Sequence, residues 1–284
     1  ALQSGEIDAT YGLPYASYPL FENENYQISS CATSRVFFAQ MNFDSPVLQD
    51  EKVREAIAMG INKEDFVAVL LDGHGEAAAG AFPDNFSFGN ETVNAPAYDP
   101  EGARALLAEA GWTDTDGDGY ADRDGEPLTI RWLTYPGRQE LPLLAQSAQA
   151  TLGEIGIRVE INSTASHHQY LESGEFDIYA SALVTAPTGD PEYFFTTCCL
   201  DASAKNAGNY HSDRLEELAK TLHTSFDAGE RASLATQMQQ QILDDNAYIF
   251  ASHLQMSIVS RSSVKGLAAH PCDYYEITVD LDVE

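Results

Sequence analysis

The chain has 284 residues, with 15 Lys and Arg against 44 Asp and Glu, and a formal net charge of −29 at pH 7. This charge repels polyanions, so it makes nucleic acid and anionic membranes poor partners. No apolar run is long enough to cross a bilayer, and the 44% of hydrophobic residues suffices for one large domain or two smaller ones.

The first residues, from Ala1, contain neither a basic segment nor an apolar one, so we expect no signal peptide in this sequence. An initiator methionine is also missing, which indicates a processed or truncated chain.

Two consecutive helices are predicted over residues 50–73. Asn62 stands where it would cap the second of them. Apolar residues recur at helical spacing in both: Val53, Ile57 and Ile61 in the first, and Phe66, Val69 and Leu70 in the second. A long Gly- and Pro-rich loop follows, and loops of this length are usually functional or held against a surface.

Asp99 and Pro100 are a typical N-cap and first-turn pair, so a further helix begins there. It leads into an acidic loop, residues 114–126, that resembles a calcium loop. The candidate metal ligands are Asp114, Asp116, Asp118 and Asp122. The twelfth loop position is Gly125 where a bidentate Glu is needed, which favours a Gly/Asp-rich turn over calcium binding. Both readings stay open.

Residues 128–184 alternate between strand and helix patterns. The predicted strands are 128–135, 157–163 and 176–184, and the helices between them are 140–156 and 166–174. This β-α-β-α-β order favours a parallel sheet with right-handed crossovers. Two amphipathic helices follow, at 212–226 and 227–246, and residues 247–267 are predicted to form two strands.

Several of these stretches together resemble one protein family. They are LQDEKVREAIAMGINKEDFVAVLLDGHGEAAAGAFP, YDPEGARALLAEAGW, LTIRW, LGEIGIRVEI, GEFDIYAS and TGDPEYFF. Their order is similar to that in the large solute-binding proteins of peptide and nickel ABC importers. Members of that family are nearly twice as long, and this sequence is similar to their C-terminal portion.

The resemblance implies an α/β fold like the type II periplasmic binding proteins, mostly the second lobe of a two-lobed fold, with a mainly parallel sheet flanked by helices. Residues 1–40 would end lobe one, residues 41–253 would form the ligand-binding lobe two, and residues 254–284 would return to lobe one. The implied function is extracytoplasmic capture of a small solute, such as a nickel or metal chelate, an opine-like compound or a short peptide. The implied partners are that solute and an ABC permease, with no catalysis and no cofactor apart from possible calcium.

Arg138 is the strongest candidate for a ligand contact. It follows a strand end and precedes a helix, and its guanidinium fits a carboxylate bidentately. In dipeptide-binding relatives an Arg at the matching place takes the ligand carboxylate. The alternative is a surface Arg paired with Glu140 or another acid. Tyr135, at the end of the same strand, is a candidate for stacking on a ligand, although packing is the commoner role of such an aromatic.

The loop after residue 184 departs from the family pattern. Peptide binders tend to carry an Asp where Pro187 stands, so an anchor for a free dipeptide amino group is missing. Nickel-binding relatives keep a Trp where Val184 or Thr185 stands, and a His beyond the loop that is absent here. The expected wall elements that remain are the backbone groups of residues 185–189, which include Thr185, Pro187 and Thr188, and the ring of Tyr193.

Two other functions stay open. A hydrolase would use Cys198 or Cys199 with His211, or paired carboxylates, but no nucleophile elbow, P-loop or metal motif supports one. A calcium-dependent adhesion module would use the acidic loop.

Overall fold

The computed structural model describes residues 1–272 and 277–283, and its centre is a mixed sheet. Seven strands form it, in the order β1-β9-β2-β8-β6-β7 with β3 beside β9. Their bounds are β1 Ala9–Tyr11, β2 Tyr26–Met41, β3 Gly75–Ala77, β6 Thr129–Thr134, β7 Arg158–Ser163, β8 Ile178–Val184 and β9 Tyr248–Arg261. Two short pairs lie outside it: β4 (Asp122–Arg123) with β5 (Glu126–Pro127), and β10 (Val264–Lys265) with β11 (Asp282–Val283).

The three strands predicted to be parallel are parallel, since β6 pairs in that sense with both β7 and β8. The sheet as a whole is not mainly parallel. Strands β1, β2 and β3 all pair antiparallel with β9, and β2 also pairs antiparallel with β8. The expected mainly parallel sheet is therefore corrected to a mixed one, in which a parallel unit joins two long antiparallel strands.

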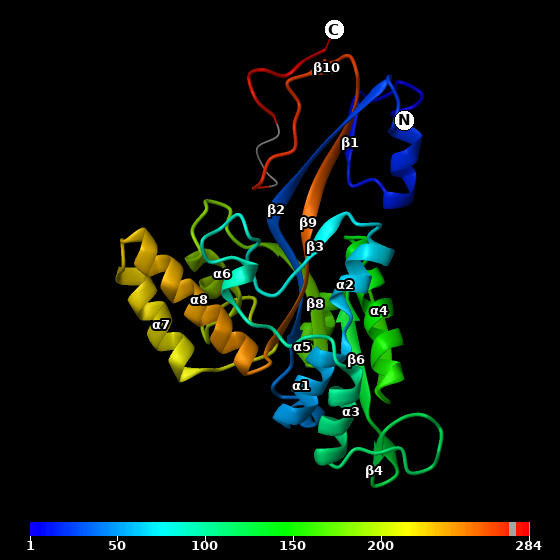
Figure 1. The fold of residues 1–284 in the computed structure, drawn as a ribbon, viewed down its shortest axis with the longest axis vertical. Coiled ribbons are helices and arrows are strands. Elements are labelled where there is room, and N and C mark those ends of the chain that lie inside the picture. Colours follow the sequence, from blue (N-terminus) through cyan, green and yellow to red (C-terminus); the bar gives the residue numbers. More distant parts are fainter. Residues whose placement is uncertain (273–276, 284) are drawn as a thin grey trace.

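Strands β2 and β9 give the molecule its elongated shape (Figure 1). They run side by side from the end that holds both termini into the body that holds the helices. Residues 247–267, predicted as two strands, form mainly one strand of 14 residues, β9. Ala9 pairs with Ser260 and Tyr26 with Arg261, so the N-terminal and C-terminal segments lie together, as predicted.

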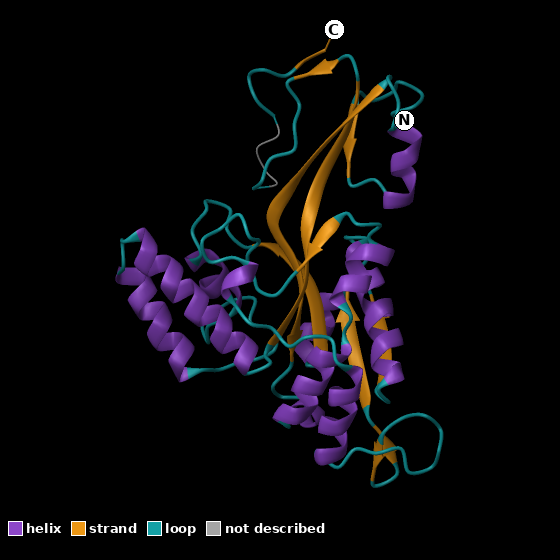
Figure 2. Ribbon diagram, in the orientation of Figure 1, coloured by secondary structure: helices purple, strands orange, loops and turns teal. Residues whose placement is uncertain are grey.

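Helices cover both faces of the sheet (Figure 2). Their bounds are α1 Glu51–Gly60, α2 Lys63–Asp65, α3 Pro100–Glu109, α4 Glu140–Glu154, α5 His167–Ser173, α6 Glu192–Cys198, α7 Asp213–Thr224 and α8 Ala228–Asp244, with short 3-10 or π turns η1 Tyr15–Phe21, η2 Pro46–Leu48, η3 Phe66–Leu70 and η4 Asn90–Thr92. Among the described residues, no helix has the length and apolar character that a membrane crossing requires.

The alternation of side chains along β2 explains why both faces are covered. Phe37 and Met41 point into the apolar cluster that includes α1, α3 and α4, whereas Val36 and Phe38 point into the cluster that includes α6, α7 and α8. A strand whose successive residues are all buried needs an apolar layer on each side.

The predicted helix caps are largely confirmed, but one predicted helical face is wrong. The side chain of Asn62 accepts a hydrogen bond from the Asp65 amide, and Asp99 accepts one from Gly102. After α2, however, the chain continues as the π turn η3, in which the Leu71 amide donates to the Phe66 carbonyl. This wider turn leaves Val69 69% exposed instead of buried with Phe66.

Buried His253, on β9, predicts a pH-dependent stability. Its Nε2 lies 3.2 Å from Asn90 Oδ1, its Nδ1 has no hydrogen-bond partner, and burial lowers its pKa to about 3. An unfolded His has a pKa of about 6.5, so between pH 6.5 and 3 the unfolded chain binds the extra proton and stability falls as pH falls.

Between pH 7.5 and pH 5 this effect amounts to about 2 kcal/mol of unfolding free energy, at about 1.4 kcal/mol per pH unit below pH 6.5. Urea unfolding of the wild type and of His253→Gln at both pH values measures it. We expect the wild type to lose about 2 kcal/mol more than the variant, since other groups titrate alike in both. Equal losses would contradict a buried neutral imidazole.

Candidate functional site

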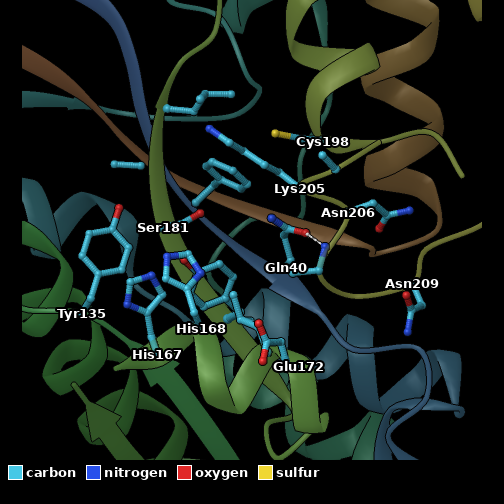
Figure 3. Close-up of a pocket in the computed structure, with 17 residues that line it drawn as sticks. Gln40, Tyr135, His167, His168, Glu172, Ser181, Cys198, Lys205, Asn206 and Asn209 are labelled. Atoms are coloured by element: carbon cyan, nitrogen blue, oxygen red, sulfur yellow. Dashed lines mark hydrogen bonds between the residues drawn. The ribbon is translucent and has the colours of Figure 1, made fainter. Parts of the chain in front are cut away.

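A cavity of about 520 Å³, hereafter the large cavity, lies beside the end of β6, one of the two strand ends that the sequence pointed to. Tyr135 follows β6, and α5 follows β7 after a short turn, so the carboxyl ends of two parallel strands deliver side chains to one place. The opposite wall is the segment after α6, residues 198–209, and the floor comes from β2 and β8. Figure 3 shows the residues that line it.

Four aromatic side chains form a group along the α5 side of this cavity, in which Tyr135 and Tyr179 stack on His167 and His168 is tilted against it by 36°. The His167 ring lies 4.6 Å from Tyr135 and 4.2 Å from His168, measured between ring centroids. The Tyr179 ring lies 5.9 Å from the His167 ring between centroids, at an interplanar angle of 15°. Burial and the neighbouring His168 both lower the pKa of His167, so its neutral form is favoured.

Polar and charged groups surround this stack. Glu172 on α5 and Lys205 on the opposite wall are both exposed, and neither has an ion-pair partner within the described residues. Gln40 on β2 holds that wall in place, because its Oε1 accepts a hydrogen bond from the Ala207 amide at 2.9 Å (Figure 3). Asn206 also stabilises this wall, since its side-chain amide nitrogen donates a hydrogen bond to the Tyr210 carbonyl.

Arg138 lies in a different and much smaller cavity, of about 30 Å³, between η1, the start of α4 and β9. The neighbouring Glu140 is buried, and its carboxylate accepts a hydrogen bond of 2.6 Å from the Tyr15 hydroxyl. Burial, with Glu140 nearby, raises the pKa of Tyr15 well above its usual range, so the phenol stays a donor. Arg138 itself forms no ion pair with Glu140 or with any other acid among residues 1–272 and 277–283.

The six predicted ligand-binding residues do not meet in one cavity. Tyr135 lines the large one and Arg138 the small one, on two sides of the same short loop. Thr185 is fully buried, and its amide donates to the Ser34 carbonyl at 2.9 Å, so its side chain offers no surface to a ligand in this conformation. The other three lie outside both cavities: Pro187 half-buried, Thr188 exposed and Tyr193 exposed.

Asp190 has a structural role. Its carboxylate accepts a hydrogen bond from the Glu192 amide, which starts α6, and it binds the Arg231 guanidinium through both oxygens. Arg231 also binds Glu192 and the carbonyls of Leu222 and Ser225, so the loop after β8 is tied to α7 and α8.

Four residues that line the large cavity were not predicted as site residues from the sequence: His167, His168, Glu172 and Lys205. One signal was available. Two adjacent histidines open a helix directly after a strand of the parallel unit, which is the position that the crevice rule marks. No sequence pattern marked Lys205, because it reaches the large cavity from the loop that follows α6 and not from a strand end.

The acidic loop lies beside β4 at the opposite end of the body from the termini (Figure 1). Ligand atoms of Asp114, Asp116 and Asp122 lie within 4.8 Å of one another, while Asp118 turns to Arg158 at 3.5 Å. Several of these carboxylate oxygens already accept hydrogen bonds within the loop. The Asp114 carboxylate accepts hydrogen bonds from the backbone amides of Gly117 and Gly119, and the Asp122 carboxylate accepts one from the amide of Thr115. The turn that the sequence favoured is therefore formed, and calcium binding there stays a prediction.

The alternative Cys–His nucleophile finds no support in the geometry. Cys198 and Cys199 are buried, and burial raises the pKa of Cys198 to about 12, which keeps the thiol protonated. His211 is exposed, and its Nδ1 lies 2.9 Å from Asp201, whose hydrogen bond raises the His211 pKa.

Comparison with known proteins decides the family. The model of the bacterial extracellular solute-binding proteins, family 5 Middle, matches residues 1–206. The chain belongs to this family. The oligopeptide-binding protein AppA of Bacillus subtilis (strain 168) is 26% identical over 287 residues, which cover 97% of this chain. The nickel-binding protein NikA of Staphylococcus aureus is 24% identical over the whole of this chain.

Solved structures show the same fold. NikA from Staphylococcus aureus in complex with Ni(L-His)2 superposes over 100% of this chain and 59% of its own, with a TM-score of 0.85 at 24% identity. A nickel ABC transporter protein from Bacillus halodurans covers the same shares, with a TM-score of 0.79 at 30% identity. AppA from Bacillus subtilis in complex with a nonapeptide reaches 0.85 at 23% identity, over 100% of this chain and 57% of its own.

These comparisons confirm the family and the type II periplasmic-binding-protein fold inferred from the sequence, with the sheet mixed rather than mainly parallel. The comparisons also show that the chain is much shorter than its relatives. The chain spans about half the length of the curated relatives it matches, 52% of AppA and 56% of NikA. The family consists of binding proteins, so a binding role is supported over the hydrolase and adhesion alternatives.

Proposed function

We propose that this chain is the solute-contacting part of an extracytoplasmic solute-binding protein, which captures a small solute and delivers it to the permease of an ABC importer. The observation that carries the proposal is the match to family 5 solute-binding proteins over most of the chain, together with the superposition of the whole chain on their solved structures. The described surface adds a cavity of about 520 Å³ beside the strand ends, within the size range of small-ligand sites.

The charge distribution supports one class of solute. Arg138 offers a guanidinium that no described acid neutralises, on a chain whose net charge of −29 favours cations overall. A solute that carries both a carboxylate and positive charge satisfies both conditions. A metal ion chelated by amino acids, or an opine-like compound, fits these conditions best, and a short peptide held mainly through its carboxylate is the second choice.

The solute retained by the full-length protein tests this proposal. We expect native mass spectrometry to show one small carboxylate-bearing solute per protein. The same solute, added back after removal, should raise the melting temperature in proportion to RT ln(1 + [L]/Kd).

The control arm of these melts is calcium alone. If calcium raises the melting temperature while nickel–histidine, dipeptides and opines do not, the adhesion alternative that uses the acidic loop replaces solute transport. If no small solute is retained and none of these compounds shifts the melt, solute capture is wrong.

A further inference from the structure

The aromatic stack of the large cavity ends at His168, and this end is open. Tyr135 and His168 lie on the two sides of His167, and Tyr179 joins the group. His167 is half-buried within it, whereas His168 is exposed and lines the cavity. Within the described residues no further ring stacks on His168, so a flat guest entering the cavity can continue the stack (Figure 3).

Two opposite charges flank this open end. Lys205 stands on the wall formed by residues 198–209 and Glu172 stands on α5, and in Figure 3 they lie on different sides of His168. Neither is neutralised by a described side chain. A cation and an anion on two walls of one cavity match the carboxylate and ammonium groups of an α-amino acid, with its side chain left to meet the rings.

We propose that this cavity is a ring-recognising subsite, which selects solutes bearing an aromatic or imidazole ring on an α-amino acid unit by stacking that ring on His168. This inference rests on the proposed function, because it names which solutes that function would accept. The ring can come from two sources, the side chain of a peptide or the amino acid that chelates a metal ion, and the chemistry of stacking is the same for both.

The protonation of the groups around His168 is consistent with the stacking of a solute ring on it. His167, which supports His168 from behind, has a lowered pKa because it is partly desolvated and beside a second imidazole. The neutral form of His167 is therefore favoured near pH 7, so the ring behind His168 adds no positive charge to the cavity. The buried thiol of Cys198 adds an uncharged wall, since its pKa is raised to about 12.

Calorimetry on the full-length protein tests the subsite with two matched pairs of probes. The first pair is alanyl-histidine and alanyl-alanine, and the second is nickel(II) with L-histidine and nickel(II) with glycine. We expect the ring-bearing member of at least one pair to bind about three- to tenfold more tightly, the range for one aromatic contact. The pair that shows the preference identifies the source of the ring.

Three variants on α5 separate stacking from other causes. In His168→Ala the ring preference should fall below about twofold while the affinity for the ring-free member changes little. In His168→Phe, which keeps a flat ring and removes both imidazole nitrogens, the preference should persist. Gln169→Ala is the matched control, because Gln169 is the exposed neighbour that does not line the cavity.

Each other outcome overturns the inference. A preference lost equally in His168→Phe and His168→Ala would mean that an imidazole nitrogen, not stacking, is responsible. A preference that survives His168→Ala would place ring recognition elsewhere. If neither pair of probes binds, the ring subsite is wrong, while the retained-solute measurement still decides the proposed function independently.

Discussion

Asp177→Ala should destabilise the fold by roughly 3 kcal/mol, because it removes the acceptor of four hydrogen bonds at a buried junction. Asp177 precedes β8 and is 4% exposed. Its carboxylate accepts from the Ser45 hydroxyl at 2.7 Å and from the backbone amide of Arg131 at 2.7 Å. It also binds the Arg131 guanidinium through Nε at 3.0 Å and Nη2 at 2.8 Å.

This one side chain joins the parallel unit to the long strands. Arg131 lies on β6, Ser45 follows β2, and the Asn42 amide donates to the Asp177 carbonyl at 2.8 Å. Without the carboxylate, the buried Ser45 hydroxyl and the Arg131 amide lose their acceptor. The Arg131 side chain is 45% exposed and can turn to water, so the expected cost is lower than for a fully buried ion pair.

Guanidinium unfolding of the variant measures the effect. Glu175→Ala is the matched control, since it removes an exposed carboxylate two residues earlier and should change stability by no more than about 0.5 kcal/mol. Asp177→Asn should fall between the two, because an amide oxygen can still accept from one donor. If Asp177→Ala costs less than about 1 kcal/mol, the junction is not held together in this way.

The sequence predicted the local elements better than their assembly. Strands β6, β7 and β8 and helices α4 and α5 were predicted within a few residues, because apolar alternation and helical spacing are local signals. The antiparallel pairing of β2 with β9 was missed. It joins residues such as Tyr26 and Arg261, and no short pattern encodes a contact over that separation.

In the candidate site, too, local features were predicted better than their arrangement in space. Tyr135 and Arg138 were proposed as ligand contacts because a strand end and an adjacent helix start are visible in the sequence. Their separation into two cavities was not, since adjacent loop residues can turn to opposite sides of a chain. Thr185 was expected in the ligand wall, but its hydroxyl lies 2.9 Å from the carbonyls of both Ser34 and Ala81, a tertiary contact that the sequence does not display.

Arg138→Ala should weaken binding of the native solute by roughly 2–5 kcal/mol, the range for losing one partner of a charged contact in a dry cleft. Three features support this expectation. Arg138 lies where α4 meets η1 and β9. No described acid pairs with it, and the one buried carboxylate beside it, Glu140, already accepts a hydrogen bond from Tyr15. The guanidinium is therefore the group in this cavity that is available to a carboxylate.

Calorimetry with the retained solute, on the full-length protein, measures the loss. Arg138→Lys keeps the charge but not the two-pronged geometry, so its affinity should lie between those of the wild type and the alanine variant. Arg214→Ala is the control for net charge, because it removes one exposed guanidinium, whose Nη2 contacts only Gln237 among the described residues, and should leave affinity unchanged. If the affinity of Arg138→Ala stays within about threefold of the wild type, which is under about 1 kcal/mol, Arg138 is a surface residue and the carboxylate of the solute is held elsewhere.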